Sequence, residues 1–390
     1  MLKRFSVCNY KNFKDELEIR FDNVSGYKFS EDCITNGLIG KMIIYGKNAT
    51  GKTNLGEAIT DICDLIMGGF TFRRSDEIYN VNADNFNSPM KFSYTFVFDN
   101  KEVLYEYSKD NNNRLLREEL VVGGEQAFLF NYQEHLFEHR GLHLIDANDA
   151  GANKYISDLK ETYQEDEADD LGRIQCFLRW LLAYNSYSEG SLSEKISNYV
   201  RGMRIVKAAS PIPFMRKYPL NGAFFNHLSE ENNLKRFEKF LNEMGVECEL
   251  VLKKNADDTL ELFFKHNTLI PFFSTASSGT KTLLELYRKA IVYGARRATL
   301  LYLDEFDAFY HYSMSEAVLN YMKKEYPNTQ VIFTTHNTNL LSNMIMRPDC
   351  LFVLSRSGKL TSYADATTRE LREGHNLAKM YIGGEFEDYE

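Results

Sequence analysis

The spacing of apolar and polar residues near the start of the chain predicts three strands followed by a helix. Apolar and polar residues alternate through residues 1–22 on both sides of a polar turn near Asn9 to Lys14, as in two half-buried strands. Met42 to Tyr45 form a short apolar run between glycines, which is typical of a buried strand. Beyond Lys52, apolar residues recur at intervals of three and four, so a helix is expected there.

The middle of the chain changes its pattern twice. Residues 90–130 alternate in segments separated by Asn-rich and Gly-Gly turns, which predicts an antiparallel meander. From about 150 to 245 the spacing becomes helical, and prolines interrupt it. Strand patterns return in the segments 247–255 and 260–266.

The C-terminal third alternates between strand and helix patterns, which implies a parallel sheet with helices on its faces. The predicted strands are residues 299–304, 329–335 and 350–356, and the predicted helices are Gly279 to about Gly294, 315–325 and a segment near 339–345. The expected fold class is therefore α/β, with one large domain and an insertion.

Composition and charge narrow the class of protein. Hydrophobic residues make up 44% of the 390 residues and charged residues 26%, which indicates a globular chain that can bury a large core. The net charge of −9 argues against a surface dominated by contacts to nucleic-acid phosphates, while a local basic groove stays open. Dispersed cysteines, no secretory leader and no apolar run of about 18 residues predict a cytoplasmic protein without a membrane span.

The segment GKNATGKT matches the phosphate-binding pattern GxxxxGK[ST]. A predicted buried strand precedes it and an amphipathic helix follows, so backbone N–H groups and a helix N-terminus converge on the loop. Lys52 is expected to contact the β- and γ-phosphates of ATP and to assist catalysis, and the Thr53 hydroxyl is expected to ligate Mg²⁺. The predicted nucleotide-binding residues of this segment are Gly46, Lys47, Asn48, Ala49, Thr50, Gly51, Lys52, Thr53 and Asn54.

The segment TLLYLDEFDAF has the form of a Walker B strand, because a buried apolar run leads into two carboxylates. Asp304, at the end of the strand, is expected to hold Mg²⁺ together with Thr53. Glu305 follows directly and is expected to act as the catalytic base that orients and deprotonates the attacking water.

Two further segments suit contacts to the terminal phosphate. In STASSGTKTLLEL, small residues precede a helix whose free N–H groups are available to a γ-phosphate, although an ordinary serine cap is the alternative interpretation. His336 follows the buried strand VIFTT at the sheet edge shared with Asp304, which favours a catalytic contact to the γ-phosphate. The predicted binding residues of the first segment are Ser277, Ser278, Gly279 and Thr280.

These four segments, in this order and spacing, resemble the ABC-type ATPase head of RecF, the SMC proteins and the OLD-like ATPases. ASSGT stands where that class has its signature motif, and His336 stands where it has its switch histidine. The turn NYKNFKD is similar to the N-terminal turn of the class, with Lys11 at its basic, nucleotide-binding position. DEFDAFYH, FTTHNTNLL and the tail RELREGHNLAKMYIGGEFE resemble the small OLD-like ATPases of bacterial anti-phage, abortive-infection systems, such as RloA, AbiL and the AriA subunit of PARIS.

The chain departs from this class at three positions or sets of positions. His311 occupies the place of the D-loop aspartate, and Ser278 replaces the second central glycine of the signature. Several residues stay open as the Q-loop glutamine, namely Gln126, Gln133, Gln164 and Gln175.

The resemblance implies a head in two halves and an assembly of several copies. Residues 1–149 would carry Walker A and an antiparallel β subdomain, residues 150–245 a helical insertion, and residues 246–390 the signature, Walker B and the switch histidine. Each copy in a head-to-tail homodimer or higher oligomer would complete its neighbour's ATP site. The expected cofactors are ATP and Mg²⁺, with no other metal, and the short segment after His336 predicts no Toprim nuclease domain.

Three functions follow from this interpretation. The first is an ATP-hydrolysing sensor and regulator of a separately encoded effector, a nuclease or other toxin, in anti-phage defence. The second is a RecF- or SMC-like ATPase that repairs DNA or binds DNA structures, for which Arg73-Arg74, Arg216-Lys217 and Arg296-Arg297 are the available basic pairs. A transporter-associated ATPase is disfavoured because such heads usually lack this N-terminal turn and this tail. Contacts to an effector or trigger are expected within residues 150–245.

Overall fold

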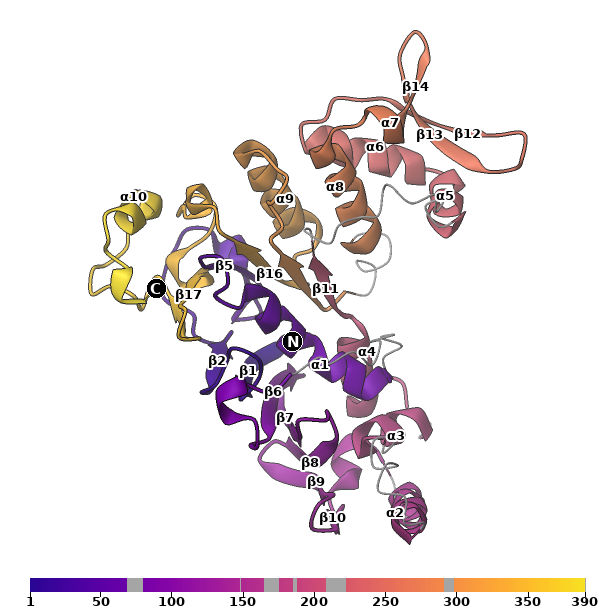
Figure 1. Ribbon diagram of the computed structural model, residues 1–390, viewed down its shortest axis with the longest axis vertical. Coiled ribbons are helices and arrows are strands. Elements are labelled where there is room, and N and C mark those ends of the chain that lie inside the picture. Colours follow the sequence, from indigo (N-terminus) through magenta and orange to yellow (C-terminus); the bar gives the residue numbers. More distant parts are fainter. Residues whose placement is uncertain are drawn as a thin grey trace.

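An antiparallel sheet of seven strands forms one end of the molecule (Figure 1). The computed structural model describes residues 1–68, 80–147, 149–164, 175–184, 188–207, 222–290 and 298–389. In spatial order the strands are β10 (Leu136–Glu138), β9 (Glu125–Asn131), β8 (Leu115–Val122), β7 (Lys101–Lys109), β6 (Met90–Phe98), β1 (Leu2–Cys8) and β2 (Leu17–Arg20). The N-terminal pair and the predicted meander belong to this one sheet because β1 pairs with both β2 and β6, and both predictions are confirmed.

A six-stranded sheet holds the strands that carry the predicted motifs. In spatial order they are β11 (Met203–Lys207), β15 (Leu300–Asp304), β16 (Gln330–Thr335), β5 (Lys41–Tyr45), β17 (Leu351–Leu354) and β18 (Leu360–Ser362). The first five strands run parallel and only β18, at the edge, is antiparallel, which confirms the predicted parallel sheet and α/β class. Because β16 lies between β5 and β15, the C-terminal ends of these three strands meet at one edge. A separate pair is formed by β3 (Ile34–Thr35) and β4 (Leu38–Ile39).

Helix α1 (Lys52–Met67) lies between the two sheets (Figure 1). It begins where predicted, and most of its apolar stripe is buried, with Leu65 half-buried. On one side, the hydroxyl of Tyr94 on β6 donates to the carbonyl oxygen of Ala58 at 2.9 Å. On the other side, the hydroxyl of Tyr302 on β15 donates to the carbonyl oxygen of Lys52. The helix that follows the phosphate-binding segment is therefore fixed to both sheets.

A buried ion pair adds to this attachment. The Nζ of Lys109 on β7 lies 2.5 Å from Oδ2 of Asp61 on α1, and the Tyr107 hydroxyl donates to the same oxygen at 2.7 Å. The side chains of Lys109 and Asp61 are only 4% and 10% exposed. Their charges therefore interact where the local dielectric constant is low, and each depends on the other.

Replacing Gly56 with alanine is expected to lower the free energy of unfolding by about 1–3 kcal/mol. A Cβ at this position of α1 would lie 2.5 Å from two ring carbons of the fully buried Tyr302 and 2.8 Å from Cδ1 of Ile205. Urea unfolding measures the loss, and Gly26→Ala is the control because nothing would lie within 4 Å of its Cβ. Equal effects of the two substitutions would contradict the packing explanation.

The segment 150–245 is not helical throughout, which corrects the expectation of a purely helical insertion. Its described helices are α2 (Asp149–Gln164), α3 (Phe177–Tyr184), α4 (Leu192–Arg201), α5 (Gly222–Ser229) and α6 (Asn233–Glu243). Between α4 and α5, the strand β11 joins the parallel sheet and pairs with β15 in register from Met203↔Leu300 to Lys207↔Asp304. The segment therefore supplies part of the sheet that carries Asp304.

A buried carboxylate holds α3 to the antiparallel sheet. Glu118 on β8 accepts hydrogen bonds from the backbone N–H groups of Phe177 at 2.5 Å and Leu178 at 3.3 Å, and from the Tyr105 hydroxyl at 2.8 Å. Burial raises the pKa of Glu118, although these donors oppose the change. A carboxylate at a helix N-terminus satisfies N–H groups that have no partner within the helix.

A lobe at the opposite end of the molecule carries the predicted signature residues (Figure 1). It contains α5, α6, the three-stranded sheet of β12 (Leu250–Lys254), β13 (Leu260–Lys265) and β14 (Leu269–Pro271), and the helices α7 (Phe272–Thr275) and α8 (Ser278–Leu286). The strands predicted near 247–255 and 260–266 are confirmed. The expected end of the helix after Gly279, near Gly294, lies outside the described residues.

The C-terminal part confirms one predicted helix and corrects another. Helix α9 (Tyr312–Glu325) is present, but near 339–345 only a single 3-10 turn forms, η6 (Thr338–Leu340). Asn337 accepts from the N–H of Asn339, and the Asn343 side chain donates to the carbonyl oxygen of Arg372 at 2.7 Å. Such side-chain to backbone bonds compete with a helix. Helix α10 (Leu377–Ile382) and the turn η8 (Glu387–Tyr389) follow.

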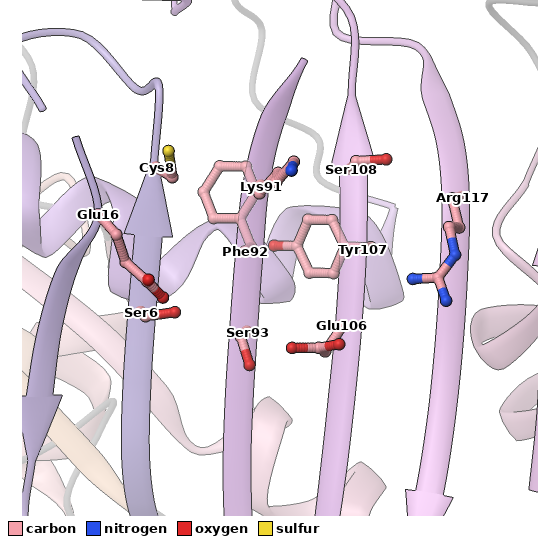
Figure 2. A pocket seen from close by; sticks show the side chains of 10 residues that line it. All are labelled: Ser6, Cys8, Glu16, Lys91, Phe92, Ser93, Glu106, Tyr107, Ser108 and Arg117. Carbon is pink, nitrogen blue, oxygen red and sulfur yellow. The ribbon is translucent and has the colours of Figure 1, made fainter. Parts of the chain in front are cut away.

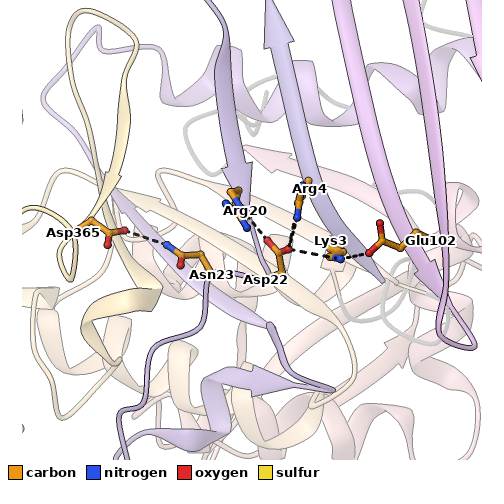
Figure 3. A network of polar contacts seen from close by, with 7 residues as sticks. All are labelled: Lys3, Arg4, Arg20, Asp22, Asn23, Glu102 and Asp365. Atoms are coloured by element: carbon orange, nitrogen blue, oxygen red, sulfur yellow. Dashed lines mark hydrogen bonds and ion pairs between the residues drawn. The ribbon is translucent and has the colours of Figure 1, made fainter. Parts of the chain in front are cut away.

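A polar network joins the end of β2 to the C-terminal part of the chain (Figure 3). Asp22 accepts from Arg4 at 3.0 Å and from Arg20 at 3.3 Å, and Asn23 donates to Asp365 at 3.2 Å. Partial burial works to raise the pKa of Asp22, but the two arginines hold it below its usual value. Among the described residues, no helix is both long enough and apolar enough to cross a bilayer.

Candidate nucleotide site

The predicted phosphate-binding loop connects β5 to α1 and requires glycine at position 51. Gly51 has φ of 100°, a left-handed conformation, and a Cβ there would lie 2.3 Å from Nδ2 of Asn12. Asn12 belongs to the N-terminal turn, donates to the carbonyl oxygen of Thr50 at 3.1 Å and accepts from Asn54 at 2.7 Å. The N-terminal turn therefore supports the loop from outside.

Lys52 is held against the loop by its own ammonium group. Its Nζ donates to the carbonyl oxygens of Gly46 at 2.7 Å and Lys47 at 3.1 Å, and the residue is 4% exposed. Burial lowers the pKa of Lys52, and the negative charges of Glu305 and Asp304 oppose this shift. The group therefore has acidic neighbours across the sheet edge and lies beside the loop backbone.

The two predicted magnesium ligands are in direct contact. The Thr53 hydroxyl donates to Oδ2 of Asp304 at 2.6 Å, and the Thr334 hydroxyl donates to Oδ1 at 2.9 Å. The same Thr334 oxygen accepts from the backbone N–H of Glu305 at 2.8 Å. A chain of hydrogen bonds thus runs from α1 through the end of β15 to the end of β16.

Glu305 adopts a conformation that is unusual for a residue with a side chain. Its φ is 48°, in the left-handed region, and its side chain is half-buried. Strain of this kind persists where the surrounding structure over-determines the backbone, and here the bond to Thr334 does so. Its carboxylate accepts no hydrogen bond from a described residue, so it is available to a water molecule.

His336 leaves the sheet between the other two motifs. It follows Thr335, the last residue of β16, whose carbonyl oxygen accepts from the N–H of Gly46 at 3.3 Å. The imidazole is exposed. The structure therefore brings the loop, Asp304, Glu305 and His336 to one edge of the parallel sheet, as the spacing predicts; their chemical roles stay predictions.

The signature residues and Lys11 have partners other than the phosphate-binding loop. Ser277 caps α8 by accepting from the N–H of Thr280 at 3.1 Å, and no hydrogen bond among the described residues joins this turn to the phosphate-binding loop. Lys11 forms an ion pair with Glu57 of α1, which also contacts Lys207 at 2.5 Å. Burial works to raise the pKa of Glu57, but the two lysines hold it below its usual value. Nucleotide contacts for these residues stay a prediction.

The Q-loop residue stays unassigned. Gln126 lies on β9, far along the antiparallel sheet, and its amide donates to Glu138 at 3.1 Å. Gln133 follows the same strand in an exposed turn. The carbonyl oxygen of Gln175 accepts from the Tyr155 hydroxyl at 2.5 Å. Gln164 ends α2.

The arrangement fits ATP with Mg²⁺. Thr53 and Asp304 offer a hydroxyl and a carboxylate oxygen side by side, the hard oxygen ligands that Mg²⁺ prefers. A Cβ at Gly46 would lie 2.6 Å from Oγ1 of Thr50. Only glycine therefore allows the two ends of the loop to pack this closely. Sequence reasoning missed the supporting residues around these groups, which are Asn12, Glu57, Asp307, Thr334 and Thr335.

A separate cavity of about 410 Å³ lies on the antiparallel sheet and contains none of the predicted site residues. Figure 2 shows its small side chains, among them Ser6, Ser93 and Ser108, between the longer charged side chains of Lys91 and Arg117 and of two glutamates. These residues come mainly from β1, β6, β7 and β8. The cavity is therefore distinct from the sheet edge that holds the phosphate-binding loop.

Comparison with known proteins identifies a matching sequence family. A family described as "AAA domain, putative AbiEii toxin, Type IV TA system" matches residues 41–342, a range that includes the phosphate-binding loop, the signature residues, the Walker B strand and His336. A comparison with curated proteins gives no match.

Solved structures with a similar fold include SMC heads. An SMC head bound to the C-winged helix domain of ScpA superposes with a TM-score of 0.51 at 15% identity, over 93% of this chain and 97% of that chain. The SMC head domain from Thermotoga maritima gives 0.44 at 14% identity, over 93% and 98% of the two chains. The first of these likenesses, with the sheet order and the loop described above, establishes the fold as that of an ABC-type P-loop ATPase head.

Proposed function

Because the chain belongs to this AAA-domain family of AbiEii type, we propose that it binds ATP with Mg²⁺ and hydrolyses it. The hydrogen-bond chain that joins Thr53, Asp304, Thr334 and Glu305 carries this proposal, since it links the loop helix to the acidic end of β15. Bound Mg²⁺ would neutralise charge on the phosphates. Thr53 and Asp304 would hold the ion, and Lys52 would donate to the β- and γ-phosphate oxygens.

Glu305 and His336 supply the remaining chemistry in this proposal. The Glu305 carboxylate accepts a proton from the attacking water and orients it, because it lies at the sheet edge with no hydrogen-bond donor among the described residues. His336 donates from its imidazole to an oxygen of the terminal phosphate from the neighbouring strand. Both residues directly follow a strand of the sheet, and hydrogen bonds of the neighbouring backbone hold these strand ends in place. They are therefore positioned more firmly than residues of a free loop would be.

Replacing Lys52 with methionine is expected to weaken ATP binding by about 10- to 100-fold, because a hydrogen bond to a charged group contributes about 1.5–3 kcal/mol. Methionine keeps most of the apolar stem while it removes the ammonium. Titration with a fluorescent ATP analogue measures the dissociation constant, and phosphate release measures turnover. Lys14→Met, on the exposed N-terminal turn, is the control. An unchanged affinity in Lys52→Met would contradict the assigned binding site.

We propose further that two copies associate with ATP between them. Ser277 and Ser278 are exposed at the start of α8, and Phe309, 49% exposed, follows the Walker B strand. The carbonyl oxygen of Phe309 would lie 3.0 Å from a Cβ at Gly279, so the turn that carries Phe309 packs against the start of α8. A second copy placed about a two-fold axis would bring this surface onto the phosphate-binding loop.

The biological function we propose is that of a sensor and regulator in anti-phage defence, as in the RloA, AbiL and PARIS systems. The family description names a toxin of a toxin–antitoxin system, which supports a separately encoded partner or effector. Among proteins of this fold, an SMC head binds the C-winged helix domain of ScpA, so the fold offers partner-binding surfaces. A cytoplasmic location is part of the proposal.

Affinity purification from the native host tests the effector proposal. Tagged Glu305→Gln protein in Mg²⁺-ATP should retain one small protein at near-stoichiometric yield, and Lys52→Met should release it. DNA that resists moderate salt, without such a protein, would overturn the proposal in favour of the DNA-binding alternative. The three basic pairs considered for DNA, Arg73-Arg74, Arg216-Lys217 and Arg296-Arg297, lie outside the described residues.

A further inference from the structure

Asp307 lies in the turn after Glu305 and holds the chain on both sides of His336. Its carboxylate oxygen Oδ2 accepts from the hydroxyl of Thr335 at 2.7 Å. The same Thr335 hydroxyl oxygen accepts from the backbone N–H of Asn337 at 2.9 Å. One carboxylate thus fixes the residue before His336 directly and the residue after it through one hydroxyl.

The other carboxylate oxygen of Asp307, Oδ1, takes part in none of these hydrogen bonds. Asp307 is 6% exposed, and its Oδ1 is buried yet receives no hydrogen bond from any described residue. Buried carboxylate oxygens are normally satisfied, so an unsatisfied one calls for a donor. Burial raises the pKa of Asp307, while the Thr335 hydroxyl, the charge of His336 and the side chain of Asn337 oppose the shift.

The turn that contains Asp307 also reaches the signature surface. The carbonyl oxygen of Asp307 accepts from the N–H of Tyr310 at 3.0 Å, so the turn closes on itself and fixes Phe309 within it. Phe309 in turn packs against Gly279 at the start of α8. Asp307 therefore connects the end of β16 to the surface on which a second copy is proposed to dock.

We propose that Asp307 is a positioning residue for hydrolysis, which fixes the backbone around His336 through Thr335 and offers Oδ1 as the acceptor for the His336 imidazole N–H. A carboxylate that accepts from one imidazole N–H fixes the orientation of the ring, and the imidazolium form then directs its second N–H toward the phosphate. This inference rests on the proposed ATPase function. It goes beyond that function by assigning a role to a residue that was not among the predicted site residues.

Three variants separate the two parts of this proposal. Asp307→Asn keeps an oxygen for the Thr335 hydroxyl but places an amide donor where Oδ1 lies, and Asp307→Ala removes both acceptors. Thr335→Val keeps the shape of the strand end and removes the hydroxyl that bridges to Asn337. Asp349→Asn is the matched control, because Asp349 is also a buried aspartate and pairs with Arg347 away from this edge.

In turnover measurements, Asp307→Asn and Asp307→Ala should each lower kcat by about 10- to 100-fold, the usual effect of losing a group that orients a reacting one. The dissociation constant for ATP should stay within about two-fold, because the loop itself is untouched. Asp349→Asn should leave kcat unchanged. A wild-type kcat in Asp307→Asn, or an equal loss of affinity and turnover, would overturn the assignment of Oδ1.

Hydrogen exchange in the nucleotide-free protein supplies a readout that does not depend on turnover. Asp307→Ala and Thr335→Val should speed exchange at the amides of Asn337 and Gly46, whereas Asp307→Asn should not, because its amide oxygen still accepts from Thr335. Unchanged exchange in Asp307→Ala would overturn the positioning claim even if the protein proves not to hydrolyse ATP. If the wild type does not hydrolyse ATP but Asp307→Ala still speeds exchange at the amides of Asn337 and Gly46, only the proposed function would be overturned.

Discussion

Replacing Glu305 with glutamine is expected to slow ATP hydrolysis by about 10²- to 10⁴-fold, the usual contribution of a general base. Glutamine has nearly the same size, so the left-handed backbone and the bond from its N–H to Thr334 stay in place. ATP affinity should change little because Lys52, Thr53 and Asp304 are untouched. Phosphate release under steady state and titration with a fluorescent ATP analogue measure the two quantities separately.

The same variant should accumulate as an ATP-bound dimer. If hydrolysis ends the association of two copies, a protein that binds but does not hydrolyse stays associated, and light scattering at saturating Mg²⁺-ATP should report twice the monomer mass. Adding Ser278→Arg should restore the monomer, because a large charged side chain would enter the docking surface. Glu325→Gln, on the exposed end of α9, is the control for the charge change. Monomer at saturating nucleotide would falsify the dimer proposal.

Replacing Asp61 with alanine is expected to lower the free energy of unfolding by about 3–5 kcal/mol, the range for breaking one side of a buried ion pair. Lys109 would keep its charge at a position that is only 4% exposed, and the Tyr107 hydroxyl would lose its acceptor. Urea unfolding followed by tryptophan fluorescence, with the single Trp180 on α3, measures the loss.

A double replacement distinguishes the lost ion pair from lost packing. Lys109→Met alone should destabilise by a similar amount, since it leaves Asp61 without its cation, while Asp61→Leu combined with Lys109→Met should recover most of the stability. Two buried charges replaced by apolar groups of similar volume are often neutral or stabilising. Strictly additive losses in the double variant would mean that the two charges do not interact.

The site could be predicted from sequence where neighbouring residues in the chain are also neighbours in space. The loop from Gly46 to Thr53 needs only its own strand and helix, and the ends of β15 and β16 meet it because parallel strands share an edge. Asp304, Glu305 and His336 were therefore placed correctly at one edge. The Thr-Thr pair before His336 carried a usable signal, because buried threonines at a strand end have hydroxyl groups that need partners.

What sequence reasoning missed depends on contacts between distant segments. The pairing of Lys11 with Glu57 joins residues that no periodicity connects, and it occupies a lysine that was expected at the nucleotide. The strand β11 is only five residues long and lies between helical patterns, so its pairing with β15 could not be seen. The segment 339–345 was expected to be helical, but Asn337 and Asn343 bond to backbone groups and only the turn Thr338–Leu340 forms.

The placement of β11 limits which parts of residues 150–245 can be replaced by the corresponding segment of a related protein. Met203–Lys207 covers one side of the strand that ends in Asp304, so excising residues 150–245 as a module would leave the Walker B strand at the border of the sheet with unpaired backbone groups. Grafts that aim to transfer partner specificity should therefore keep α4 and β11 and replace either the part of this segment before α4 or the helices α5 and α6. A chimaera built this way tests specificity and keeps the six-stranded sheet intact.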